Sequence, residues 1–142
     1  MIYLDASAIV KLVVEEAESG ALRAWLRRRR APRVTSDLSR VEVPRACMRA
    51  EPTAMLQAQR AVSRLSTVPL TPKVLSAAAA LQPPGLRTLD AVHVASALAV
   101  GPAVRAFVTY DHRLEVAARQ HGLVRGAPVL TAAGTSPYHR RP

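Results

Sequence analysis

The first seven residues constrain the fold more than any other stretch, because they join a buried strand directly to a charge. Ile2, Tyr3 and Leu4 are apolar and show no alternation with polar residues. Such a run is typical of a strand in a parallel sheet that helices cover on both faces. Asp5 follows at once, and a carboxylate at the mouth of an apolar strand is costly unless a cation or a donor group meets it. The remaining sequence must therefore supply a partner for Asp5.

Short apolar strands alternate with helical segments along the chain. Strands are predicted at residues 2–4, 33–36, 68–70, 106–109 and 129–130. Helices are predicted at residues 8–14, 15–30, 39–49, 52–66, 72–81, 91–100 and 112–121. This alternation indicates an α/β layer structure with a mainly parallel, short-stranded sheet. At 142 residues we expect one domain over residues 1–132, followed by a basic tail at 133–142.

The charge of the chain favours a polyanionic partner. The sequence has 20 Lys and Arg against 10 Asp and Glu, and all but two of the bases are Arg. A GC-rich genome explains part of the Arg bias, but the net charge of +10 still favours nucleic acid as a partner. With Cys47 as its one cysteine, the chain has no disulfide framework or Cys-based zinc site, and Cys47 is predicted to pack in the core. No leader peptide and no apolar run of membrane-spanning length is found, so a cytoplasmic protein without a membrane partner is expected.

Several acids stand where strands end or helices begin, and each has a purely structural interpretation. Glu42 fits a capping box with Ser39. Asp90 lies in the first turn of a helix that Thr88 is placed to cap, and Asp111 fits an N-cap. Taken one at a time, these three acids are better explained as helix caps than as catalytic groups. The remaining two acids away from the predicted surface are Asp5, which has no capping box, and Asp37.

Taken together, four of the acids indicate a metal site. The carboxyl ends of parallel strands and the starts of the following helices lie at one edge of a sheet. Asp5 and Asp111 follow strands, whereas Glu42 and Asp90 begin helices. Converging carboxylates repel one another, and a hard divalent cation such as Mg²⁺ or Mn²⁺ relieves that repulsion. A carboxylate-held metal in a basic protein suggests phosphodiester hydrolysis, in which the metal activates water and stabilises the phosphate charge.

Four segments of the chain resemble the PIN-domain nucleases, and most closely the VapC-type toxins of bacterial toxin–antitoxin pairs. They are Ile2-Tyr3-Leu4-Asp5-Ala6-Ser7, Arg40-Val41-Glu42-Val43, Arg87-Thr88-Leu89-Asp90-Ala91-Val92-His93-Val94-Ala95-Ser96-Ala97 and Val108-Thr109-Tyr110-Asp111. The resemblance covers residues 2 to about 130, and the segment around Asp90 is its most specific part. It implies a three-layer α/β/α fold with one nuclease domain.

The resemblance also implies an activity, partners and a set of site residues. The activity is a Mg²⁺- or Mn²⁺-dependent endoribonuclease that leaves a 5′-phosphate and a 3′-hydroxyl. The partners are an RNA substrate, a cognate antitoxin and a second copy in a homodimer. The catalytic acids are Asp5, Glu42, Asp90 and Asp111, of which Asp5, Asp90 and Asp111 bind the metal. The auxiliary residues are Ser7, whose hydroxyl lies near the metal, Thr109, and Arg87.

Some features leave alternatives open. Pro44 would disturb a helix that begins at Ser39, so that helix either starts later or is kinked. Either change alters the direction in which the Glu42 side chain points. Arg87 is placed either to contact the scissile phosphate or to pair with Asp90, and His93 is expected to be a packed core residue. A non-catalytic RNA- or partner-binding domain, whose acids only cap helices, is the alternative function. A phosphatase is disfavoured, because position 7 is Ser and not the second Asp of an Asp-x-Asp motif.

Overall fold

Four short strands form one parallel sheet in the order β3-β2-β1-β4. The strands are β1 (Ile2–Leu4), β2 (Arg33–Ser36), β3 (Ser66–Val68) and β4 (Ala106–Val108). Tyr3 of the central strand β1 is in register with Val34 on one side and with Phe107 on the other. The computed structural model describes residues 1–123. The strand predicted at 129–130 and the tail predicted at 133–142 lie outside the described residues.

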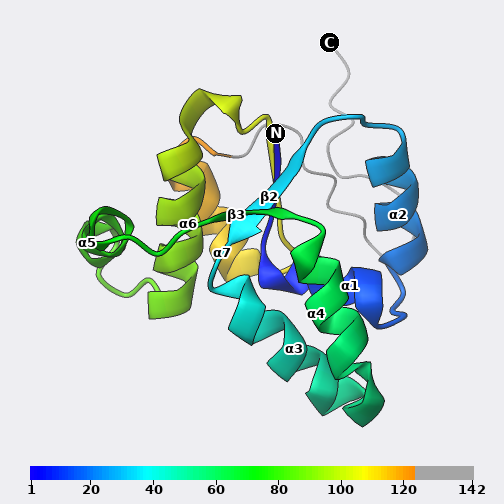
Figure 1. Cartoon of the computed structure of the whole chain (residues 1–142). Helices are drawn as coiled ribbons and strands as arrows, with labels where there is room; N and C mark the ends of the chain where they lie inside the picture. Colours follow the sequence, from blue (N-terminus) through cyan, green and yellow to red (C-terminus); the bar gives the residue numbers. More distant parts are fainter. Residues whose placement is uncertain (124–142) are drawn as a thin grey trace.

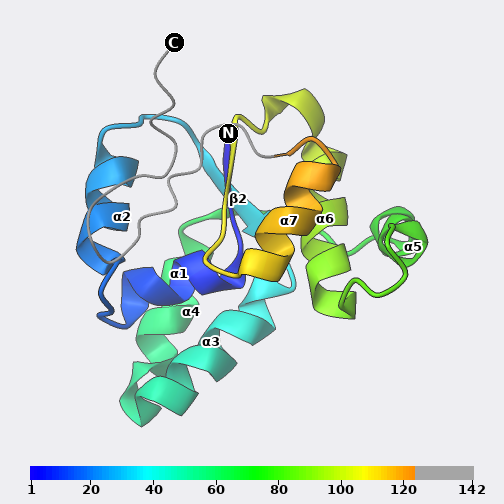
Figure 2. The same cartoon turned by 180° about the vertical axis from the view of Figure 1, so that it is seen from behind.

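Helices cover both faces of this sheet and give the predicted three-layer α/β/α fold (Figures 1 and 2). One layer contains α1 (Ala6–Val13), α2 (Ser19–Arg27), α3 (Ser39–Ala50), η1 (Pro52–Ala54) and α4 (Met55–Ser63). The other contains α5 (Pro72–Ala80), α6 (Thr88–Val100) and α7 (His112–Gln120), with η2 (Gly101–Ala103) following α6. Among the described residues, no helix combines the length and the apolar character needed to cross a membrane.

The strand β1 is buried on both faces, as its unbroken apolar sequence predicted. Successive side chains of a strand point to opposite faces. Ile2 and Leu4 accordingly pack in the core with α1–α4, whereas Tyr3 packs in the core with α5–α7. Tyr3 is fully buried and its ring stacks on that of Phe107, with the centroids 4.9 Å apart. Cys47 is buried in the first of these cores, as expected.

Several predicted boundaries were wrong, and three of them have a clear local reason. The helix predicted at 8–14 begins earlier, at Ala6, because the side chain of Asp5 caps it. The helix predicted at 15–30 begins later, at Ser19, because a turn joins the Glu16 N–H to the Ser19 hydroxyl at 2.9 Å. The strand predicted at 68–70 ends at Val68, because the following Pro69 has no N–H to donate to a neighbouring strand.

Candidate active site

The site lies where the direction of the sheet reverses. From β1 the chain moves outward through β2 to β3, and then crosses to the opposite side of β1 to form β4. The helices that follow the two neighbouring strands, α1 after β1 and α7 after β4, therefore lie in different layers (Figure 2). A crevice opens between such helices at the carboxyl ends of the strands, and ligands bind there in open α/β sheets. Asp5 and Asp111 are the residues that lead into these two helices.

A pocket of about 550 Å³ occupies this crevice, and all four predicted acids line it. Asp5, Glu42, Asp90 and Asp111 come from separate elements and reach the same pocket, as does Ser7. Within residues 1–123, however, they do not form a group of three or more His, Cys, Asp or Glu side chains arranged to hold a metal ion. The four acids thus line one cavity, but their side chains are not close enough together to form a complete set of metal ligands.

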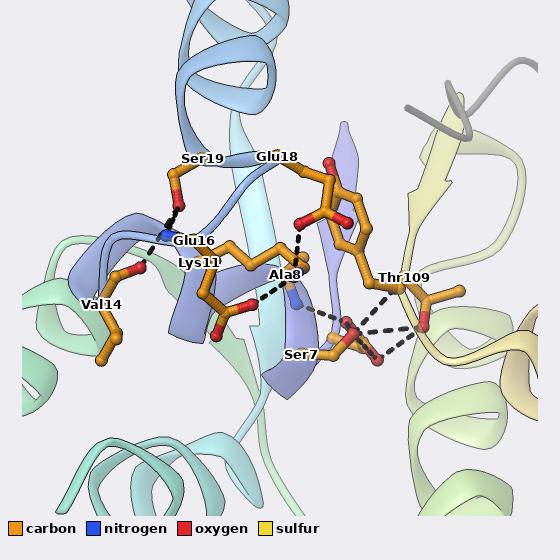
Figure 3. Close-up of polar contacts among 10 residues, drawn as sticks. Ser7, Ala8, Lys11, Val14, Glu16, Glu18, Ser19 and Thr109 are labelled. Atoms are coloured by element: carbon orange, nitrogen blue, oxygen red, sulfur yellow. Dashed lines mark hydrogen bonds and ion pairs between the residues drawn. The ribbon is translucent and has the colours of Figure 1, made fainter. Parts of the chain in front are cut away.

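Asp5 is buried, with 3% of its surface exposed, and three donors surround it. The Ser7 hydroxyl donates to Oδ1 at 2.7 Å, the Thr109 hydroxyl donates to Oδ2 at 2.7 Å, and the Ala8 N–H donates to Oδ1 at 2.9 Å (Figure 3). The last of these bonds makes Asp5 the N-cap of α1, although the sequence shows no capping box for it. Burial nevertheless raises the pKa of the Asp5 carboxyl, although these donors and His93 act in the opposite direction.

Ser7 and Thr109 connect the start of α1 to the loop after β4. While each hydroxyl donates its proton to Asp5, the Ser7 Oγ accepts the N–H of Tyr110 at 2.8 Å, and the Thr109 Oγ1 accepts the N–H of Asp111 at 3.0 Å. The two hydroxyls lie 3.4 Å apart. They therefore fix the loop after β4 against the start of α1, and with it the position of Asp111.

Asp90 is the acid in this pocket that has a buried oxygen without a hydrogen-bond partner in the described part of the chain. It lies in the first turn of α6 with 9% of its surface exposed, and its buried Oδ2 has no hydrogen-bond partner among the described residues. Burial is the main cause that raises its pKa, followed by the negative charge of Asp111, while Arg87 acts in the opposite direction. The N-cap of this helix is Arg87 without a side-chain capping bond, so the prediction that Thr88 caps it was wrong.

Asp111 is the N-cap of α7, as its position after a strand indicated. Its Oδ1 accepts the N–H of Arg113 at 2.8 Å and that of Leu114 at 3.3 Å. Its Oδ2 lies 3.7 Å from Arg87 Nη1, in an ion pair whose two side chains are 55% and 35% exposed. Arg87 thus pairs with Asp111 and not with Asp90, and an exposed pair of this kind contributes little to stability.

Glu42 faces the pocket because of a contact that the sequence did not reveal. The helix α3 begins at Ser39 and continues through Pro44, so a later start is wrong. Its N-cap is Leu38, and the Ser39 hydroxyl bonds to that of Thr35 at 2.7 Å, so the predicted capping box is absent. The Glu42 carboxylate instead bonds to the ring of His93, with Oε2 2.6 Å from Nε2.

Three ionisable residues of the pocket were not among the predicted site residues. His93, expected to be only a packed residue, is buried and also lines the pocket. Arg45 and Arg49 line the pocket from α3. Helical spacing was the available signal, because residues three, four or seven apart share a helix face. His93 follows Asp90 by three positions, and the two arginines follow Glu42 by three and seven.

The burial of Asp90 leads to a prediction about stability. A carboxyl with a raised folded pKa binds its proton more tightly in the folded state, so its ionised form opposes folding above that pKa. Without metal at pH 7, Asp90→Asn is expected to raise the free energy of unfolding by about 1 kcal/mol, a common gain when an unfavourable charge is removed. The gain should shrink as the pH falls towards the unfolded pKa of about 3.9. Urea unfolding at a series of pH values measures both effects.

Asp37→Asn is the matched control, with the opposite expected sign. The hydrogen bond from Arg40 to Asp37 lowers the pKa of that carboxyl. Its contribution to stability is therefore present above the unfolded pKa and lost as the pH falls through the lower folded pKa. A loss of stability in Asp90→Asn at pH 7 similar to that in Asp37→Asn would contradict the proposed strain at Asp90.

Known proteins resemble this chain over most of its length. The PIN domain family model matches residues 2–120. Ribonuclease VapC46 of Mycobacterium tuberculosis (strain ATCC 25618 / H37Rv) is 46% identical over 127 residues, which are 89% of this chain and 97% of the relative. Ribonuclease VapC47 of Mycobacterium tuberculosis (strain CDC 1551 / Oshkosh) is 39% identical over 132 residues, covering 90% and 97%. Ribonuclease VapC35 of the same strain is 41% identical over 131 residues, covering 90% and 97%.

The match spans nearly the whole described region and includes every element that contributes an acid to the pocket. The resemblance seen in the sequence is thereby confirmed. The chain belongs to the PIN-domain family and, within it, groups with the proteins named VapC.

Proposed function

We propose that this protein is a Mg²⁺- or Mn²⁺-dependent endoribonuclease that acts as the toxin of a toxin–antitoxin pair. The observation that carries the proposal is the convergence of Asp5, Glu42, Asp90 and Asp111 on one pocket at the reversal point of the sheet. Family membership supports it, since the relatives are named as ribonucleases. A cognate antitoxin, a homodimeric state and a cytoplasmic location are proposed on the same likeness.

The residues of the pocket fit a hard divalent cation. The candidate ligands Asp5, Asp90 and Asp111 offer carboxylate oxygens, which Mg²⁺ and Mn²⁺ prefer. The buried Asp90 Oδ2 lacks a partner among the described residues, and burial raises the pKa of both Asp5 and Asp90. A cation supplies the positive charge that such buried carboxylates lack. When bound, it would polarise the attacking water and offset the negative charge that develops on the phosphate.

The chain's own side chains then have separate tasks. Ser7 and Thr109 hold Asp5 in place through hydrogen bonds to its two oxygens. Glu42 lies on the α3 wall of the pocket, where its carboxylate is placed to accept a hydrogen bond from the attacking water. Arg87, paired with Asp111 and half exposed, is placed to contact the phosphodiester at the rim.

Two arginines on α3 supply a surface for the RNA backbone. Arg45 and Arg49 are exposed side chains one helical turn apart, on the same helix face as Glu42. Neither makes a hydrogen bond or ion pair within residues 1–123. Free guanidinium groups beside an acidic pocket are suited to bind the phosphates that flank the scissile bond. They also counter the repulsion between the four acids and a polyanionic substrate.

The contribution of these arginines is measurable as salt dependence. Arg45→Gln and Arg49→Gln are each expected to weaken RNA binding and to reduce the slope of log affinity against log salt by about 0.7, the value for one lost phosphate contact on a single strand. Arg64→Gln removes an exposed arginine that does not line the pocket and serves as the matched control. A slope that is unchanged in the two α3 variants, or reduced equally in the control, would exclude a local phosphate contact.

The activity itself is tested by mapping RNA ends in cells. Brief expression of the wild type is expected to create new 5′-phosphate ends in total RNA, and Asp5→Asn should create none. The alternative of a non-catalytic binding domain has one observation in its favour, since Asp5 and Asp111 both cap helices. Capping does not explain Glu42 or the unpartnered oxygen of Asp90. Identical RNA ends in cells expressing either protein would favour the binding domain.

A further inference from the structure

We propose that His93 is a positioning residue, which holds the Glu42 carboxylate in the pocket by linking it to the central strand through Tyr3. This inference rests on the proposed function. His93 Nε2 lies 2.6 Å from Glu42 Oε2, and His93 Nδ1 lies 2.9 Å from the Tyr3 hydroxyl. The three side chains come from α3, α6 and β1, and are separated by 51 and 90 positions along the chain. The contact is therefore a product of the tertiary fold.

The His93 ring has a rigid support. It is buried and meets the fully buried Tyr3 ring edge-on, with centroids 6.0 Å apart and an interplanar angle of 83°. Tyr3 in turn stacks on Phe107 of β4, with an angle of 6° between the rings. Since β1 and β4 are neighbouring strands, the aromatic pair belongs to the sheet itself. His93 is thus held against buried side chains of the central sheet.

The hydrogen-bond roles of the three groups follow from their chemistry. An ionised carboxylate only accepts hydrogen bonds, so Nε2 of His93 is the donor to Glu42. In the neutral ring Nδ1 is then an acceptor, and the Tyr3 hydroxyl donates to it. Burial, followed by the negative charge of Asp5, raises the pKa of Tyr3 well above its ordinary value. Tyr3 accordingly keeps its proton and remains a donor over the whole physiological range of pH.

This chain of bonds joins the two walls of the pocket. Glu42 lies on α3 and His93 on α6, and these two helices belong to different layers (Figure 1). The Glu42 side chain is 21% exposed and His93 only 3%. One oxygen of Glu42 is fixed by His93, which leaves the other free for water or metal. Groups that orient a reactive carboxylate in this way typically affect metal affinity or activity by about 10–100-fold.

Two substitutions of His93 separate positioning from packing. In His93→Gln the side-chain amide reaches the place of Nε2 and keeps a donor for Glu42. In His93→Asn the shorter amide reaches only the place of Nδ1, near Tyr3. Val94→Ala, at a fully buried neighbour on α6, is the control for loss of core packing alone. All variants are assayed for RNA cleavage with Mn²⁺ and for urea unfolding without metal.

We expect His93→Asn to lower the cleavage rate, or raise the Mn²⁺ concentration needed for half of it, by about 10–100-fold. His93→Gln should remain within a few-fold of the wild type, and Val94→Ala should lose stability but not activity. Equal activities of the Asn and Gln variants would overturn the proposal. So would a loss in each variant that merely follows its unfolding midpoint.

The contact is also tested without any enzymatic readout. If His93 holds Glu42, His93→Asn should lower the urea midpoint clearly in the wild-type background and much less in the Glu42→Ala background. A shift of the same size in both backgrounds would overturn the proposal. Absence of cleavage by the wild type would instead refute the proposed nuclease function. The coupling between the two midpoints would still show whether His93 holds the carboxylate.

Discussion

Asp5→Asn is expected to reduce the rate of RNA cleavage by about 10²–10³-fold or more, the effect of removing a principal electrostatic group from an active site. Asp5 is central to the pocket, because one of its oxygens accepts the hydroxyl of Ser7 at the start of α1 and the other accepts the hydroxyl of Thr109 in the loop after β4. An amide at this position removes the negative charge that a cation requires. It also places an NH₂ group where at least one hydroxyl now donates. Cleavage of a labelled RNA by purified protein under single-turnover conditions measures the loss.

A matched control separates loss of chemistry from loss of structure. Asp37→Asn makes the same chemical change at an acid that pairs with Arg40 and does not line the pocket. It should cleave RNA at the wild-type rate even if it is somewhat less stable. Circular dichroism and the unfolding midpoint show whether Asp5→Asn remains folded. Retention of Mn²⁺-dependent cleavage by folded Asp5→Asn would refute the proposed mechanism.

Mn²⁺ is expected to stabilise the wild-type protein strongly. A ligand at about 100 times its dissociation constant stabilises the folded state by about 2.7 kcal/mol. For a domain of this size the corresponding rise in Tm is roughly 5–10 °C. Asp90→Asn should show almost no rise, because one candidate ligand and much of the local repulsion are lost together. Differential scanning fluorimetry with increasing Mn²⁺ gives the shifts directly.

The same titration contains an internal test of where the metal binds. Without metal, Asp90→Asn is expected to be the more stable of the two proteins, and with saturating Mn²⁺ the less stable. This reversal of order distinguishes a site at Asp90 from weak binding to other surface acids. Parallel Tm shifts in the wild type and in Asp90→Asn would place the binding elsewhere. Glu51→Gln, at an exposed acid outside the pocket, should shift like the wild type.

The first two strands were predicted correctly at both ends. Residues 2–4 match β1 because a strand buried on both faces leaves little room for polar residues. Residues 33–36 match β2 although three of its four residues are polar. Helix starts were less predictable, since they depend on which side chain takes the capping position. Asp5 caps α1. The Ser39 hydroxyl, in contrast, does not cap α3 but bonds to the hydroxyl of Thr35 on the preceding strand. Such choices are decided by tertiary contacts that one sequence does not contain.

The sequence predicted which acids form the candidate site, but not which side chains they contact. The edge of a parallel sheet gathers residues that follow its strands, which is why Asp5 and Asp111 were expected to lie near each other. The partner of Glu42 was not predictable, because His93 is 51 positions away on a helix in the opposite layer. Arg87 was expected to pair with Asp90 in its own turn, but the loop after β4 brings Asp111 within 3.7 Å.

The order of the strands in the sheet also determines when the site is assembled. The central strand is made first, but its neighbour β4 and the loop with Thr109 and Asp111 are made more than a hundred residues later. A chain emerging from the ribosome carries Asp5 from the start, yet until β4 adds to the sheet it lacks the hydroxyl of Thr109 and the carboxylate of Asp111. On the proposed function, the nascent protein is therefore expected not to cleave nearby RNA until almost all of its folded domain has been made.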